Sequence, residues 1–328
     1  MRSSPRSPGP IADLLRPAIL IAAALIALTT ASLAIGSASL WGGDLGTGWL
    51  LAVSRFPRTA AALLAGAGLA VAGTVVQQAV QNRLVEPSLT GTTESAMLGL
   101  IAITLIAPGM SIGWKAALAA VAALAGTGGF LMLARRVPMQ DPLLLPIVGL
   151  IYGGILSAMA IWLAWNADLM QLLGAWRLGE FSGIVQGRYE LLWIIAALSL
   201  LLYTLADRLT LLGLGETQAR SLGLNYTQTR LLALAVMSLI ASLVTVTVGA
   251  LPFVGLVAPN LISRWRGDNL RANLPFIAAG GGGLVLAADI AGRLIRYPYE
   301  IPAATVFSVF GAAIFLWLLH SVPARSHG

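Results

Sequence analysis

The sequence predicts an all-α integral membrane protein. Of its 328 residues, 58% are hydrophobic and only 10% are charged, and the mean hydropathy is +0.85. Soluble domains have far more polar compositions. A membrane-spanning helix needs about 20 apolar residues, so about ten transmembrane helices joined by short loops fill this length. The 36 glycines agree with close packing of helices in lipid.

Several classes of function are excluded by the composition. The chain has no cysteine, which rules out disulfides, thiolate metal sites and cysteine nucleophiles. Its histidines, His320 and His327, lie near the C-terminal end without partners for a zinc site. The only lysine, Lys115, follows Trp114, so the chain lacks the Gly-Lys-Ser/Thr loop that cradles phosphates. We expect no metal or cofactor bound by this chain, and ATP could act only on another polypeptide.

The apolar runs divide the chain into a membrane domain and two tails. Residues 1–17, rich in Pro, Ser and Arg, predict a disordered tail. Residues 18–320 predict a single transmembrane domain, and residues 321–328 form a C-terminal tail. The expected spans are residues 18–37, 57–79, 95–107, 116–133, 143–165, 191–206, 231–248, 249–265, 276–292 and 301–319.

The eighth expected span is broken by Pro252, Gly255 and Pro259. Irregular backbone at membrane depth is tolerated only where it is buried in protein or lines a cavity. A topology with both termini inside gives the inner loops about twice as many basic residues as the outer loops, in agreement with the positive-inside rule. Basic residues in such loops set membrane orientation, so the net charge of +7 does not indicate nucleic-acid binding.

The most polar stretch between two spans, residues 207–230, predicts a short helix on the membrane surface. Gly215 marks its start, and Glu216 suits the positive N-terminal end of a helix. Gly223 can end the helix in a left-handed conformation. The residues alone are equally consistent with an ordinary loop.

Long blocks of the sequence resemble one family of transporters. The FecCD-type permeases, which import iron-siderophores, haem or vitamin B12, have a block similar to RFPRTAAALLAGAGLAVAGTVVQQAVQNRLVEPSLTGT. Their C-terminal third resembles ALPFVGLVAPNLISRWRGDNLRANLP and the later LAADIAGRLIRYPYEIPAATVFSVFGAAIFLWLL. The resemblance covers nearly the whole chain. It implies a BtuC-like type II ABC importer permease, multi-pass in the bacterial inner (plasma) membrane, with both termini in the cytoplasm.

Within that family, short motifs resemble the branch that serves catecholate and mixed citrate–catecholate ferric siderophores. These motifs are GTTESAMLG, VQGRYELL, APN, GDNLR and IRYPYEIP. Vitamin B12 or haem import remains an alternative, although the B12 pattern usually has His where Asn260 stands. From a different class, a secondary transporter driven by an ion gradient would need ionisable groups near the membrane midplane, and the centres of the spans carry almost none.

The resemblance also implies partners. These are two ATPase subunits that hold ATP and Mg, a second permease (a homologous chain or another copy), a periplasmic or lipid-anchored substrate-binding protein, the ferric siderophore and membrane lipid. The residues implied for ATPase coupling are Gly215, Glu216, Ala219, Arg220, Leu222 and Gly223. Those implied for binding-protein docking are Arg55, Arg58 and Arg296, with Arg293 as a competing choice for the last. Those implied for the translocation path or its gate are Met139, Gln140, Asp141, Gly153, Gly154 and Ser157.

Some of these residues also have a purely structural explanation. Arg55 and Arg58 could be interfacial arginines whose side chains reach toward the headgroups. Small residues such as Gly66, Gly73 and Gly153 suit close helix packing. Asp289 and Arg293 are four residues apart and can therefore pair on one face of a helix.

Overall fold

The computed structural model describes residues 10–36, 47–136 and 144–320, and every regular element in these ranges is a helix. Six helices are long and apolar enough to cross a membrane. They are α1 (Pro10–Ala34), α3 (Phe56–Val80), α5 (Ile112–Ala134), α6 (Leu144–Asn166), α11 (Tyr226–Thr247) and α13 (Leu270–Ile295). The chain is therefore a multi-pass membrane protein.

The expected count of ten spans is not confirmed. A seventh candidate is the pair of α8 (Trp193–Thr204) and α9 (Ala206–Gly213), whose axes bend by 65°. The other expected crossings are shorter helices. They are α4 (Thr92–Ile106), α12 (Val254–Arg266) and α14 (Ala303–His320). At about 1.5 Å per residue, the 13 residues of α12 cover only about 20 Å, less than the thickness of a bilayer core.

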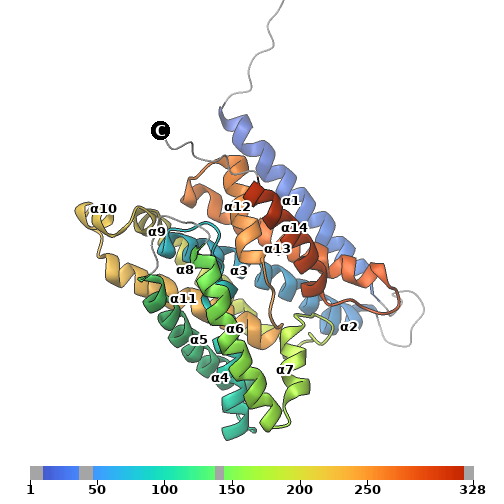
Figure 1. Cartoon of the computed structure of the whole chain (residues 1–328). Coiled ribbons are helices and arrows are strands. Elements are labelled where there is room, and N and C mark those ends of the chain that lie inside the picture. The colour runs from blue at the N-terminus through green and yellow to red at the C-terminus, as the bar shows by residue number, and fades with distance from the viewer. Residues whose placement is uncertain (1–9, 37–46, 137–143, 321–328) are drawn as a thin grey trace, which may run out of the picture.

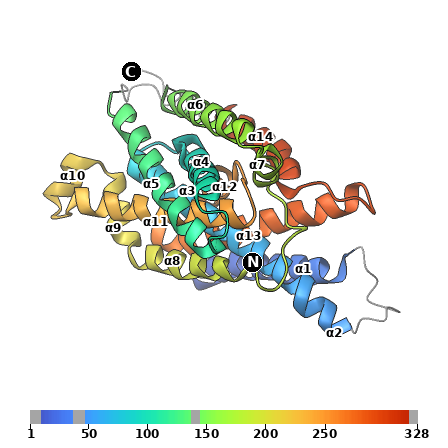
Figure 2. The same ribbon diagram turned by 90° about the horizontal axis from the view of Figure 1, so that it is seen from below.

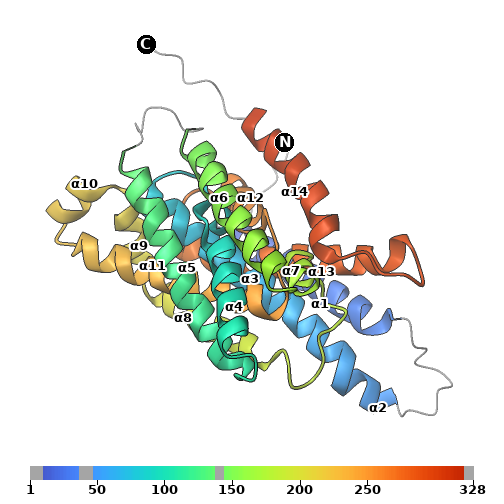
Figure 3. The ribbon, with the colours of Figure 1, turned by 60° about the horizontal axis from the view of Figure 1, so that its bottom comes forward.

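The small elements connect these helices. They are α2 (Thr47–Leu50), η1 (Leu51–Arg55), η2 (Pro87–Thr90), α7 (Met170–Arg177), η3 (Glu190–Leu192) and α10 (Glu216–Ser221). Figures 1 and 3 show α10 projecting from one end of the bundle, with α2 at the other. Seen from below, α6 and α14 lie along one side of the molecule with α7 beside them (Figure 2).

Two helix starts differ from the expectation. The first helix begins at Pro10, so the end of the expected disordered tail is helical, and residues 1–9 lie outside the described residues. Proline suits the first turn of a helix because its missing N–H has no partner there in any case. Helix α11 begins at Tyr226 rather than at residue 231, because the Asn225 side chain accepts a hydrogen bond from Gln228 N at 3.3 Å and caps a polar first turn.

Helix α3 is the centre of the fold. Of the 25 residues of α3, 19 are buried, and the helix packs against α11, α12 and α13. Glycines allow these close approaches. A Cβ on Gly73 would lie 1.9 Å from Gly255 O, and one on Gly66 would lie 2.4 Å from Gly281 O. The prediction that these glycines serve helix packing is confirmed.

Replacing Gly73 by alanine should therefore prevent α12 from packing on α3. The contact is with backbone, which cannot turn aside as a side chain can, so we expect a loss of well over 1 kcal/mol and little folded protein. The matched control is Gly128→Ala in α5, where an added Cβ meets nothing within 4 Å. Alanine there should stabilise by about 0.5–1 kcal/mol. Thermal unfolding in detergent measures both variants, and equal midpoints would contradict this account.

The expected eighth crossing is interrupted at Pro252, as predicted, whereas Gly255 and Pro259 lie within the continuous helix α12. Residues 249–253 are not helical, and α12 begins only at Val254, after Phe253 in the left-handed conformation with φ 67°. Helix α4 begins in the same way, after Gly91 with φ 69°. Two short helices thus begin within the protein, and their N-terminal ends border one cavity.

Candidate functional site

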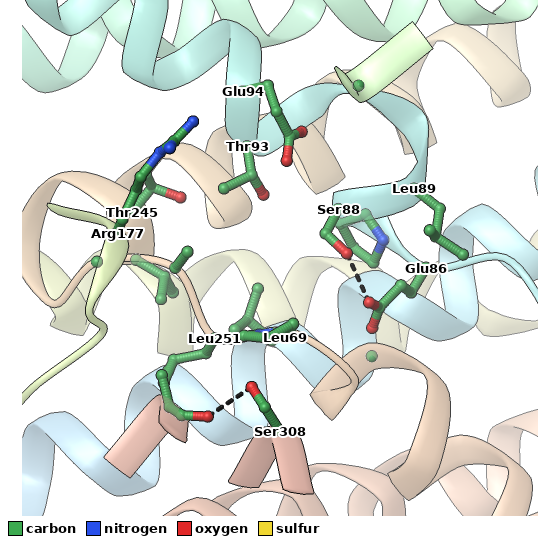
Figure 4. Close-up of a pocket in the computed structure, with 18 of the residues that line it drawn as sticks. Leu69, Glu86, Ser88, Leu89, Thr93, Glu94, Arg177, Thr245, Leu251 and Ser308 are labelled. Carbon is green, nitrogen blue, oxygen red and sulfur yellow. Dashed lines mark hydrogen bonds between the residues drawn. The ribbon is translucent and has the colours of Figure 1, made fainter. Parts of the chain in front are cut away.

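A cavity of about 440 Å³ lies among α4, α6, α12 and α14 (Figure 4). Its lining is mostly small, hydroxylated or apolar. The lining residues from the sequence prediction are Gly153, Gly154 and Ser157 of α6, so the structure brings these three together at one wall. The other three predicted path residues, Met139, Gln140 and Asp141, lie outside the described residues.

Glu86 connects the two non-α-helical segments that precede α4 and α12 beside this cavity. Its Oε1 accepts hydrogen bonds from Ser88 Oγ at 2.5 Å and from Phe253 N at 3.0 Å. Phe253 precedes α12, so the carboxylate lies at the positive N-terminal end of that helix. The residue is only 3% exposed. We conclude that Glu86 stabilises the irregular backbone that forms the cavity wall.

Sequence reasoning missed the charged residues of the cavity, which are Glu86, Glu94 and Arg177. The segment around Glu86 was expected to be an inner turn, yet it lies inside the protein. Pro87 and Gly91 could have indicated this arrangement. A proline and a glycine so close together favour a chain that turns back before its next helix. Ionisable groups are therefore rare in the helix centres but present where the helices begin.

Arg177 and Glu94 lie on the same wall as Ser157 and Gly153. Arg177, the last residue of α7, donates a hydrogen bond to Ser157 Oγ. A Cβ built on Gly153 would lie 3.7 Å from Glu94 Cδ, so this carboxylate rests against the bare face of α6. Gly153 and Ser157 are separated by about one helical turn.

Ion pairs and hydrogen bonds connect the start of α3 with the C-terminal ends of α1 and α13. Arg58 contacts Asp289 at 2.7 Å and Glu300 at 2.9 Å, and Arg293 contacts Asp289 at 2.8 Å. The side chains of Asp289 and Arg293 are only 2% and 5% exposed. The predicted pairing of Asp289 with Arg293 is confirmed. Arg293 also donates to Ser32 Oγ at 2.7 Å, which connects the pair to α1.

Arg55 and Arg58, which the resemblance implies for docking, are largely enclosed by the protein, and their docking role stays a prediction. Arg55 is 6% exposed and donates to the carbonyl oxygens of Leu33 and Ala34 at 2.7 and 3.0 Å. These carbonyls are at the end of α1, where a helix leaves its last acceptors unsatisfied. Arg58 neutralises a buried carboxylate. Of the three arginines, Arg296 is the exposed one, and its guanidinium lies over the Tyr299 ring.

The predicted surface helix at residues 215–223 is present as α10. Gly215 (φ 95°) precedes it and Gly223 (φ 83°) follows it, as the sequence indicated. Glu216 pairs with Arg220 at 2.6 Å on the exposed face, while Ala219 is fully buried against the bundle. Leu222 is 60% exposed. A single exposed leucine is ordinary on a protein surface, so the contact of α10 with an ATPase stays a prediction.

The comparisons with known proteins agree with this architecture. The FecCD transport family matches residues 18–321. Among the relatives, the petrobactin import system permease protein FatD of Bacillus anthracis is 40% identical over 81% of this chain and 80% of its own. The ferric-anguibactin transport system permease protein FatD of Vibrio anguillarum is 36% identical over 83% and 87%. The vitamin B12 import system permease protein BtuC of Citrobacter koseri is 36% identical over 81% of each chain.

A similar solved structure has the same overall arrangement. It is a metal-chelate type ABC transporter in an inward-facing conformation, with a TM-score of 0.79 and 25% identity, covering 93% of this chain and 99% of that one. The family match over residues 18–321 includes the cavity, α10, the ion pairs of Asp289 and α1 from residue 18 onward. On these grounds, the chain belongs to the FecCD transport family.

Proposed function

We propose that this chain is the membrane permease of an ATP-driven, binding-protein-dependent ABC importer and that its cargo is a ferric siderophore. The observation that carries the proposal is the cavity of about 440 Å³ among α4, α6, α12 and α14, where glycines leave room for a solute and serine and threonine hydroxyls can bind it by hydrogen bonds. The petrobactin and anguibactin permeases among the relatives support this cargo class.

The proposed mechanism is alternating access. Two ATPase subunits, which hold ATP and Mg, dock on α10 of each permease. Their closure moves α6 and α14 about the cavity, which opens in turn to the two sides of the membrane. The second permease, a homologous chain or another copy, completes the pathway. Both termini are in the cytoplasm, and a periplasmic or lipid-anchored binding protein delivers the cargo at the opposite face, where Arg296 is exposed.

Deletion of the gene in the source bacterium should abolish growth on one ferric siderophore under iron limitation. Growth on vitamin B12 or haem should be intact, because in this proposal neither uses this permease. The comparison uses one strain supplied with each nutrient in turn, with the intact gene restored as control. Loss of B12 use with normal siderophore use would favour the B12 alternative, to which a 36% identical relative points.

A further inference from the structure

One carboxylate oxygen in the cavity has no hydrogen-bond partner in the described part of the chain. Glu94 lies in the first turn of α4 and points into the cavity (Figure 4). Its Oε2 is buried and has no hydrogen-bond partner among the residues that the structure describes. An unpaired charge in such surroundings is costly. This oxygen is therefore open to a cation, a hydrogen-bond donor or a proton that the described residues do not supply.

The other glutamate of the cavity, Glu86, has hydrogen-bond partners within the protein where Glu94 Oε2 has none among the described residues. Both residues border the same cavity, but Glu86 Oε1 accepts from Ser88 Oγ and Phe253 N. Glu86 therefore serves the protein's own backbone. Glu94 rests beside Gly153, where α6 presents no side chain at all.

A positive group lies near Glu94 on the same wall without pairing to it. Arg177 donates to Ser157 Oγ and, in the described part of the chain, forms an ion pair with no carboxylate. Ser157 follows Gly153 by four residues, which is about 6 Å along the axis of α6. Arg177 and Glu94 therefore contact one face of this helix about one turn apart. Beside the hydrogen-bonded Glu86, the cavity thus presents one further negative group and one positive group that do not pair with each other.

We propose that Glu94 binds a protonated amine of the cargo and that Arg177 binds an anionic oxygen of the same molecule. The inference rests on the proposed function for the route of the cargo and narrows its chemical class to a chelate that carries both groups. A guanidinium suits an anionic oxygen because it offers several N–H donors in a fixed plane. Each charge would replace part of the water that the cargo loses on entering the cavity.

The natural absence of cysteine gives a direct test on the full-length chain in detergent. A reporter cysteine at Gly154→Cys lines the cavity and meets nothing within 4 Å. Its reaction rates with 2-aminoethyl methanethiosulfonate, a primary ammonium, and 2-sulfonatoethyl methanethiosulfonate, an anion of similar size, are measured by intact mass. Both reagents attack the same thiolate, so the ratio of the rates reports the local electrostatic potential.

We expect the ammonium reagent to react faster at Gly154→Cys, and Glu94→Gln to lower the rate ratio about tenfold. Arg177→Gln should raise the ratio, because it removes the opposing positive charge. The control reporter is Ser308→Cys on α14, at the opposite wall of the same cavity (Figure 4). Its ratio should change by less than about threefold with Glu94→Gln, because the interaction weakens with distance.

A ratio at Gly154→Cys that Glu94→Gln leaves unchanged would overturn the proposal, because the carboxylate would then be protonated or paired. Failure of both reagents to react would overturn it too, since the cavity would not admit an alkylammonium group. The measurement needs no ATPase, binding protein or cargo. Failure of siderophore uptake would therefore refute the proposed function without altering this result, and the two conclusions can be separated.

Discussion

Replacing Asp289 by alanine should remove most of the folded protein from the membrane. The carboxylate is 2% exposed and neutralises both Arg58 and Arg293, of which Arg293 is itself 5% exposed. Its loss leaves positive charge buried at the contact of α3 with α13. Breaking a buried ion pair from one side costs about 3–5 kcal/mol. Thermal unfolding of detergent-purified protein should show the effect as a strongly lowered midpoint or as no recoverable monodisperse protein.

The matched control is Glu300→Gln, which removes the other carboxylate on Arg58. Glu300 is 29% exposed, and Arg58 keeps Asp289 in this variant, so the cost should be below about 1 kcal/mol. Asp289→Asn, which preserves the volume but not the charge, should resemble Asp289→Ala. Equal midpoints for Asp289→Ala and Glu300→Gln would show that the ion pairs of Asp289 with Arg58 and Arg293 contribute little to stability.

This pairing also shows where prediction from the sequence stops. The Asp289–Arg293 pair was predictable because four residues on a helix place two side chains on one face. The Arg58–Asp289 contact joins residues 231 positions apart, and only the packing of α3 on α13 brings them together. The sequence does not reveal that contact, so Arg58 was assigned to docking on a binding protein and not to an ion pair within the fold. A single sequence gives the type of such a residue but not its long-range partner.

The same limit applies to the cavity. The family resemblance implied that Gly153 and Gly154 line the translocation path, and the structure places both residues at the wall of the cavity. Glu86 and Glu94 were missed because their segment is short and polar, which is also typical of a loop in water. The segment of Glu86 and Glu94 differs from a loop in water because other helices bury it. The N-terminal ends of α4 and α12 then supply the donors and the positive potential that such buried acids need.

By contrast, α10 was predictable in detail because its signals are local. Gly215 and Gly223 allow the left-handed turns at its two ends, and both have positive φ in the structure. Glu216 and Arg220 pair at the spacing of one helical turn. Local signals establish the helix, but its contact with an ATPase is a question for experiment.

Replacing Leu222 by aspartate should abolish transport while leaving the permease folded. Leu222 is 60% exposed, so a charge at this position costs the isolated chain little. At a protein contact, the same change removes an apolar group and buries an unpaired carboxylate, which costs several kcal/mol and weakens binding more than a hundredfold. Glu216→Lys should act in the same direction, since its exposed pair with Arg220 contributes less than about 0.5 kcal/mol to the fold.

Co-purification of the ATPase subunit and uptake of the labelled cargo should both be measured for each variant, beside thermal unfolding of the permease. The matched control is Ile112→Asp, the same kind of change at a residue that is 51% exposed at the start of α5. It should retain the ATPase, because α10 is unaltered. If Leu222→Asp retains both the ATPase and uptake, α10 is not the docking helix. A lowered unfolding midpoint for Leu222→Asp alone would instead assign Leu222 to the fold, because docking cannot affect the isolated chain.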